Sequence, residues 1–141
     1  MSAIPVLLLT AYAAYTDIKR KEIDDWVSVA ILVYSVFIDL ILRRQTFILS
    51  FFCAFVIFIS LYLVYLITKN IGGGDVKLLT ALAFYFSDKI VILLLLASII
   101  GLLCALIKGI KEKTYLKTET VFAPAIFAAT VLTIPLMKVI M

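Results

Sequence analysis

The 141-residue sequence contains no histidine and two cysteines, Cys53 and Cys104, which both lie inside apolar runs. Without histidine, the chain cannot build a Cys/His zinc site, a Cys–His nucleophile or a Ser–His–Asp triad. Reactive chemistry in this protein must therefore depend on carboxylates. The two cysteines are expected to be reduced and to serve as small apolar packing residues.

Charged residues are also scarce. They make up 16% of the chain, against 65% hydrophobic residues, and the mean hydropathy is +1.21. A water-soluble domain of this size keeps more charge on its surface, so this composition indicates an integral membrane protein. The net charge of +4 does not indicate a nucleic-acid-binding protein, because the basic residues are scattered among connecting loops.

Uncharged apolar runs alternate with short charged clusters and predict an all-α, polytopic bundle of about six transmembrane helices. The three longest runs have at least 18 residues each, close to the length that a helix needs to cross a bilayer. Short loops and the lack of a long linker predict a single membrane-embedded domain over residues 1–141. The runs are 1–16, 26–38, 45–68, 78–87, 90–107 and 120–137.

Three of these runs need comment. The first lacks a preceding basic region, so we interpret it as a span and not as a signal peptide. The second is long enough if it continues to Leu42, which places Asp39 one helical turn before Arg43 and predicts a structural pair between them. The fourth is short, which favours a start below the membrane surface in a polar cavity.

The distribution of basic residues predicts the orientation. With the N-terminus outside, the loops at 17–25, 69–77 and 108–119 face the cytoplasm and carry nine lysines and arginines, against four on the other side. This agrees with the positive-inside rule. We therefore expect a multi-pass protein of the cytoplasmic (inner) membrane.

Two cytoplasmic loops carry the candidate chemistry. In the first, Asp17 follows the end of the first span. The second reads Gly72-Gly73-Gly74-Asp75-Val76-Lys77. Consecutive glycines allow positive φ and a close approach by another main chain, so we expect this loop to dip inward and present Asp75, with a helix resuming at Leu78.

Asp17 and Asp75 can meet, because an even number of membrane crossings separates them and both must emerge on the same face. Two carboxylates close together cannot both ionise cheaply, so one keeps a proton while the other acts as a base. That arrangement activates a water molecule for attack on a peptide carbonyl. The pair predicts aspartyl protease chemistry that needs neither a metal nor another cofactor.

Three segments together carry a resemblance to a known family. They are Asp17 with its following basic residues and Ile23, the glycine-rich segment 72–79, and Phe122-Ala123-Pro124-Ala125 at the start of the last span. In this order they resemble the type IV prepilin peptidase family, the GxGD membrane aspartyl proteases. The resemblance implies that Asp17 and Asp75 are the catalytic pair. It also points to substrate or loop support by Gly72, Gly73, Gly74 and Lys77.

The same resemblance implies the substrates. They are type IV pilin-like or archaeal flagellin-like precursors, cut between a short charged leader and an apolar helix at the cytoplasmic membrane boundary. Larger members carry an added N-terminal part with two Cys-x-x-Cys pairs and an N-methylation activity. This sequence contains no such pair, so we expect a peptidase without methyltransferase activity. Two details depart from the family pattern: Asp24-Asp25 replace a common Pro-Asn pair, and Thr120-Val121 replace a common Ile-Pro.

Plainer interpretations remain open for individual residues. Asp17 alone could be a solvated interface residue or a helix cap, and the glycines could form a flexible loop or a close helix contact. Lys77 could be an interfacial anchor. Asp24 and Asp25 compete with Asp17 as partners for Asp75, although we expect them to cap the helix that begins at Trp26.

Two other functions are compatible with a small membrane bundle. One is a proton- or cation-coupled transporter or channel that uses intramembrane carboxylates. The other is a non-catalytic assembly subunit that holds pilins. Only the protease hypothesis requires a GxGD loop together with an earlier aspartate on the same membrane face.

Overall fold

The computed structural model describes residues 3–42, 45–68, 71–112 and 122–140. Within these ranges the chain forms helices and no strands, which confirms the all-helical prediction. The elements are α1 (Ile4–Arg20), α2 (Asp25–Leu42), α3 (Phe47–Thr68), α4 (Gly73–Phe86), the short 3-10 helix η1 (Ser87–Lys89), α5 (Ile90–Glu112) and α6 (Ala123–Ile140).

Several of these helices are suited to a membrane. Among the described residues, three segments are long and apolar enough to cross a bilayer: Asp25–Leu42, Phe47–Ile67 and Gly73–Lys111. Ala123–Val139 is a shorter apolar helix. Together with the many exposed large apolar side chains, this makes the chain a multi-pass membrane protein. The predicted count of about six spans is not confirmed.

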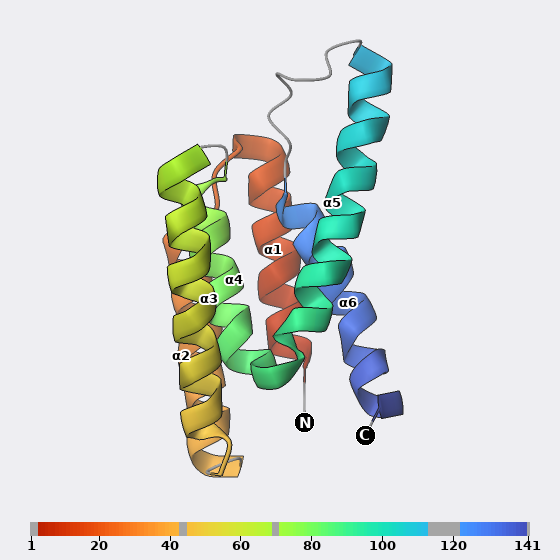
Figure 1. Cartoon of the computed structure of the whole chain (residues 1–141). Coiled ribbons are helices and arrows are strands. Elements are labelled where there is room, and N and C mark those ends of the chain that lie inside the picture. The colour runs from red at the N-terminus through yellow and green to blue at the C-terminus, as the bar shows by residue number, and fades with distance from the viewer. Residues whose placement is uncertain (1–2, 43–44, 69–70, 113–121, 141) are drawn as a thin grey trace.

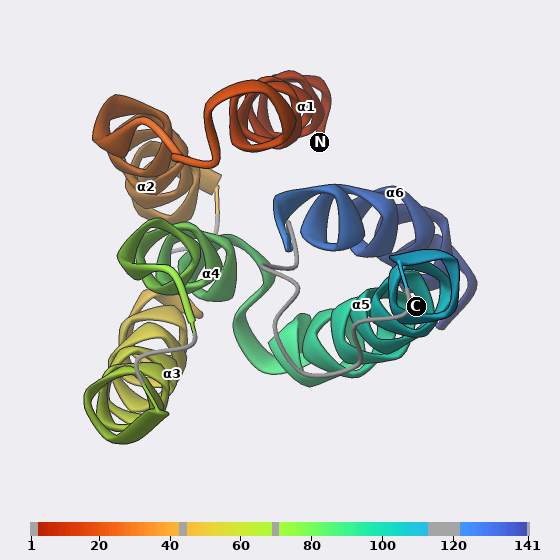
Figure 2. The same cartoon turned by 90° about the horizontal axis from the view of Figure 1, so that it is seen from above.

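The helices run alternately up and down, so that the α1–α2 and α3–α4 connections lie at one end of the molecule (Figure 1). Seen from above, α4 lies between α2 and α3, and α6 lies between α1 and α5 (Figure 2). The molecule thus consists of two three-helix groups, joined where α1 meets α2 and where η1 leads into α5. Asp17 belongs to one group and Asp75 to the other.

The core is centred on α4, where nearly every residue from Val76 to Phe86 is buried. Aromatic contacts fix this helix to both neighbours: Tyr85 stacks with Tyr34 of α2, and Phe84 makes an edge contact with Phe47 of α3. This central position explains how a short apolar run forms a stable helix, because other helices cover its sides.

The structure corrects several local expectations. α1 continues to Arg20, so Asp17 lies in a helix and not in a loop. Lys19 and Arg20 in its last turn suit the negative end of the helix dipole, and Lys21 ends it in the left-handed conformation with φ 55°. α4 begins at Gly73 and not at Leu78.

Two predictions outside the candidate site have mixed outcomes. Asp39 is buried in α2, but Arg43, its expected partner, lies outside the described residues. The Oδ2 atom of Asp39 has no hydrogen-bond partner within the part of the chain that the structure describes. Cys53 is half-buried on α3, whereas Cys104 is exposed on α5, so the expected packing role is wrong for Cys104.

Candidate active site

Asp17 is held by the start of α6. Its side chain lies in the last turns of α1 and is 8% exposed. The Oδ2 atom accepts a hydrogen bond of 3.0 Å from the backbone N–H of Ala123, the first residue of α6. This N–H has no partner within its own helix, because the first turn of a helix leaves its donors unpaired. The carboxylate therefore lies at the positive end of the α6 dipole.

Asp75 occupies the first turn of α4. Its backbone N–H donates to the Gly72 carbonyl over 3.1 Å, which holds the start of the helix in place. Its Oδ1 atom is buried and has no hydrogen-bond partner among the described residues. Asp17 is close enough for the charges of the two carboxyls to interact.

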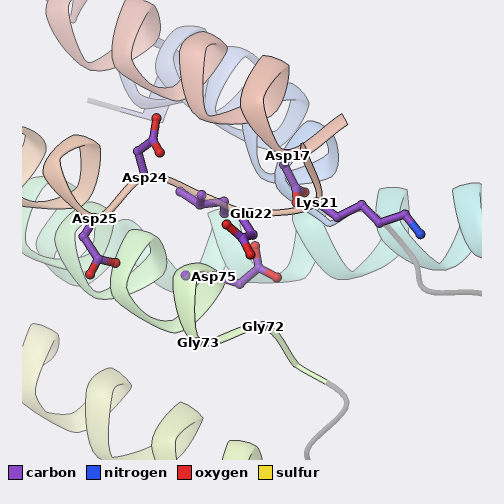
Figure 3. Close-up of a pocket in the computed structure, with 10 residues that line it drawn as sticks. Asp17, Lys21, Glu22, Asp24, Asp25, Gly72, Gly73 and Asp75 are labelled. Atoms are coloured by element: carbon purple, nitrogen blue, oxygen red, sulfur yellow. The ribbon is translucent and has the colours of Figure 1, made fainter. Parts of the chain in front are cut away.

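The two acids line one cleft of about 460 Å³. Figure 3 shows Asp17 reaching it from α1 and Asp75 from α4, with the connection between α1 and α2 alongside. Segments far apart in the sequence thus meet here. The lining is strongly acidic, with five carboxylate side chains and a single lysine; the residues are Asp17, Lys21, Glu22, Ile23, Asp24, Asp25, Gly72, Gly73, Gly74 and Asp75.

The three glycines of this cleft have different surroundings. A Cβ atom at Gly72 would lie 3.2 Å from Oδ2 of Asp75, and one at Gly74 would lie 2.9 Å from the Cβ atom of Ile23. A Cβ atom at Gly73 would meet nothing within 4 Å. Gly72 therefore allows the Asp75 side chain to lie close to the backbone, and Gly74 allows Ile23 to do so. No described glycine has a positive φ, so this cleft uses the small size of glycine and not its conformational freedom.

Lys77 does not line the cleft. Its Nζ atom lies 2.8 Å from both carboxylate oxygens of Asp25, which ties the second turn of α4 to the start of α2. Both side chains are more than half exposed, so the ion pair contributes little to stability. The structure places this lysine beside the cleft as a link between two helices.

Asp24 and Asp25 each have a partner other than Asp75. Asp25 is paired with Lys77, while Asp24 accepts a long hydrogen bond of 3.4 Å from the Tyr12 hydroxyl. α2 begins at Asp25, and the carbonyl of Asp24 accepts the N–H of Val27. The two acids therefore stand at the start of α2, as expected for residues that favour a helix N-terminus.

The role of the 122–125 segment could not be predicted from its local sequence. Its resemblance to a family motif marked it as relevant, but gave no reason for that relevance. The structure supplies one, because Ala123 donates to Asp17, 106 residues earlier in the chain. In the described part of the chain, no group of three or more Cys, Asp or Glu side chains could hold a metal ion.

The chain matches a known protein family. The model of the type IV leader peptidase family matches residues 4–106, a range that includes both Asp17 and Asp75. No curated protein and no solved structure matches the chain.

Proposed function

This chain belongs to the type IV leader peptidase family, and we propose that it is an aspartic-type endopeptidase in which Asp17 and Asp75 perform the catalysis. The observation that carries the proposal is the shared cleft, which brings the two carboxyls together from α1 and α4. Peptide hydrolysis by two carboxyls requires no metal and no histidine, so it is open to this chain.

The hydrogen bonds suggest how the two acids divide the work. Asp17 accepts an N–H bond at the positive end of α6, a setting that stabilises a carboxylate. The Oδ1 atom of Asp75 is buried and unpartnered, a setting that penalises a carboxylate more than a neutral carboxyl group. In our proposal, Asp75 therefore carries the resting proton, and Asp17 is the base.

The reaction then follows from this assignment. Asp17 takes a proton from a water molecule in the cleft, whose oxygen attacks the scissile carbonyl carbon. Asp75 donates its proton to the carbonyl oxygen and stabilises the tetrahedral intermediate. When the C–N bond breaks, the leaving nitrogen receives the proton that Asp17 had taken, and one hydroxyl of the intermediate returns its proton to Asp75 as the C=O bond re-forms. The products are a new carboxyl group and a new amine.

The proposed substrates are type IV pilin-like or archaeal flagellin-like precursors, cut between a charged leader and an apolar helix. The cleft lies at the end of the bundle where α1 ends and α4 begins. We propose that this end faces the cytoplasm, with the N-terminus outside and all six helices crossing or entering the membrane as one domain over residues 1–141. The junction of leader and apolar helix would then lie beside the two acids.

The proposal is tested by co-expressing the protein with candidate precursors and reading leader removal as a gel shift. Asp17→Asn and Asp75→Asn should each lower the cleavage rate by at least about 10³-fold. The reason is that removing one member of a catalytic pair that acts as a unit costs nearly as much as removing both. Both proteins should still insert and fold. Asp24→Asn and Asp25→Asn are matched controls from the same cleft and should keep substantial activity.

Retained cleavage by the Asp75→Asn protein would defeat the assignment. The transporter hypothesis predicts a different pattern, in which proteoliposomes show proton or cation flux and no precursor is cut. A non-catalytic subunit would tolerate both substitutions in a cleavage assay supplied with an active peptidase.

A further inference from the structure

Gly101, in the middle of α5, is in close contact with Phe122, the residue before α6. A Cβ atom at Gly101 would lie 2.6 Å from Cε2 and 3.0 Å from Cδ2 of the Phe122 ring. Distances under 3.0 Å are not found for real Cβ atoms, so the edge of the ring occupies the space that any other residue at 101 would need. With the ring in this position, only glycine fits at 101.

This glycine is not explained by the needs of its own helix. Glycine weakens a helix interior relative to alanine, because it loses more backbone freedom on folding. Ala97, one turn earlier on the same face of α5, is buried, so Gly101 lies on the packed face of this helix. The specific partner of Gly101 is the Phe122 ring.

Phe122 is in turn fixed to the first turn of α6. Its carbonyl accepts the N–H groups of Ala125 and Ile126 over 3.0 and 3.1 Å. Its ring packs against the hydrophobic core. A shift of this residue therefore moves the start of α6, including the next residue, Ala123, whose N–H holds Oδ2 of Asp17.

We propose that Gly101 is a positioning residue for Asp17. It lets the Phe122 ring lie against α5, and this places the first turn of α6 so that the Ala123 N–H meets the Asp17 carboxylate. The chain of contacts runs from α5 through α6 to α1, all within one three-helix group. Its importance for catalysis rests on the proposed function, in which Asp17 is the base.

The link can be observed without measuring activity. Among the ten phenylalanines, only Phe122 and Phe127 are followed by alanine. Labelling phenylalanine carbonyls with ¹³C and alanine amides with ¹⁵N therefore selects two NMR signals, those of Ala123 and Ala128. Ala123 reports the bond to Asp17, and Ala128, inside α6, is an internal control. The Asp17→Ala protein identifies the Ala123 signal.

In detergent-solubilised protein, Gly101→Ala should move the Ala123 signal upfield, because the hydrogen bond to Asp17 is lengthened or lost, and leave Ala128 in place. Adding Phe122→Leu, which removes the Cε and Cζ atoms, should return the signal to its position in the Phe122→Leu protein alone. Both of these proteins carry the ¹³C label on leucine carbonyls, because residue 122 is then leucine. Leu102→Ala, at an exposed position on the same helix, should change neither signal. An unmoved Ala123 signal in Gly101→Ala, or one that Phe122→Leu does not return, would overturn the proposal.

If Gly101→Ala does not fold, Phe122→Ala tests the same link without a clash. With ¹³C on alanine carbonyls in this variant, since residue 122 is then alanine, removal of the ring should move the Ala123 signal, and an unchanged signal would show that the ring does not place α6. Because this variant adds no atoms, it keeps the test available in a protein that does not tolerate the larger side chain at 101.

Cleavage measurements separate this proposal from the proposed function. A misplacement of about 1 Å costs up to about 10²-fold in rate, so Gly101→Ala should lower kcat by about 10-fold to 100-fold while KM is unchanged, and Phe122→Leu should restore it. A moved Ala123 signal with unchanged kcat would support the positioning link and contradict the role of Asp17 as base. Loss of activity with an unmoved signal would contradict the link alone.

Discussion

The two neighbouring glycines at the start of α4 should respond in opposite ways to the same substitution. Both lie in the first turn of the helix, so alanine at either position gains at most about 0.5–1 kcal/mol, the value for a helix interior. At Gly73 the added Cβ atom meets nothing within 4 Å, so the gain in helix propensity is the only effect expected there. At Gly74 it would lie 2.9 Å from the Cβ atom of Ile23.

The magnitude follows from the difference between the two sites. Ordinary contact between carbons begins at about 3.5 Å, so Ile23 or α4 must move by several tenths of an ångström. Overpacking of this kind costs about 1–3 kcal/mol. Because the propensity gain is common to both variants, the free energy of unfolding of Gly74→Ala should be about 1–3 kcal/mol lower than that of Gly73→Ala.

The assay is reversible unfolding in mixed detergent micelles, followed by circular dichroism. A third variant, Ile23→Val, tests which atom of Ile23 is responsible. Since the close contact is with the Cβ atom of Ile23, which valine retains, Ile23→Val should not reduce the gap between the two alanine variants. Equal stabilities of Gly73→Ala and Gly74→Ala would refute the reasoning, and so would a gap that Ile23→Val closes.

Two further predictions concern the residues around Asp75. Gly72→Ala places a Cβ atom 3.2 Å from Oδ2 of Asp75, so it should lower kcat for precursor cleavage by about tenfold with little change in unfolding free energy, because a small displacement of a reacting group is costly; unchanged kcat would contradict this. The exposed pair of Lys77 and Asp25 should show a coupling energy below about 1 kcal/mol in a double-mutant cycle of Lys77→Met and Asp25→Asn. A coupling above about 2 kcal/mol would show that the pair is shielded from water.

Much of the candidate site could be predicted from the sequence because the signals are local. Charge-free runs identify helices in a membrane, and counting crossings places Asp17 and Asp75 at one end of the bundle. The glycine-rich segment also marked a place of close approach. The predicted helix boundaries were wrong: α1 runs through Asp17 to Arg20, and α4 begins at Gly73. The reason is that a helix continues while its backbone hydrogen bonds and the charges at its ends are satisfied.

The sequence by itself thus determined the helical class, the membrane environment and the choice of Asp17 and Asp75 as candidate residues. Tertiary structure alone decided which glycines are needed, that Lys77 pairs with Asp25, and that Ala123 holds Asp17. The physical reason is the distance along the chain over which each effect acts. Hydropathy and helix propensity act over one or two turns, whereas the partner of a carboxylate or the space beside a glycine depends on how helices distant in the chain pack together.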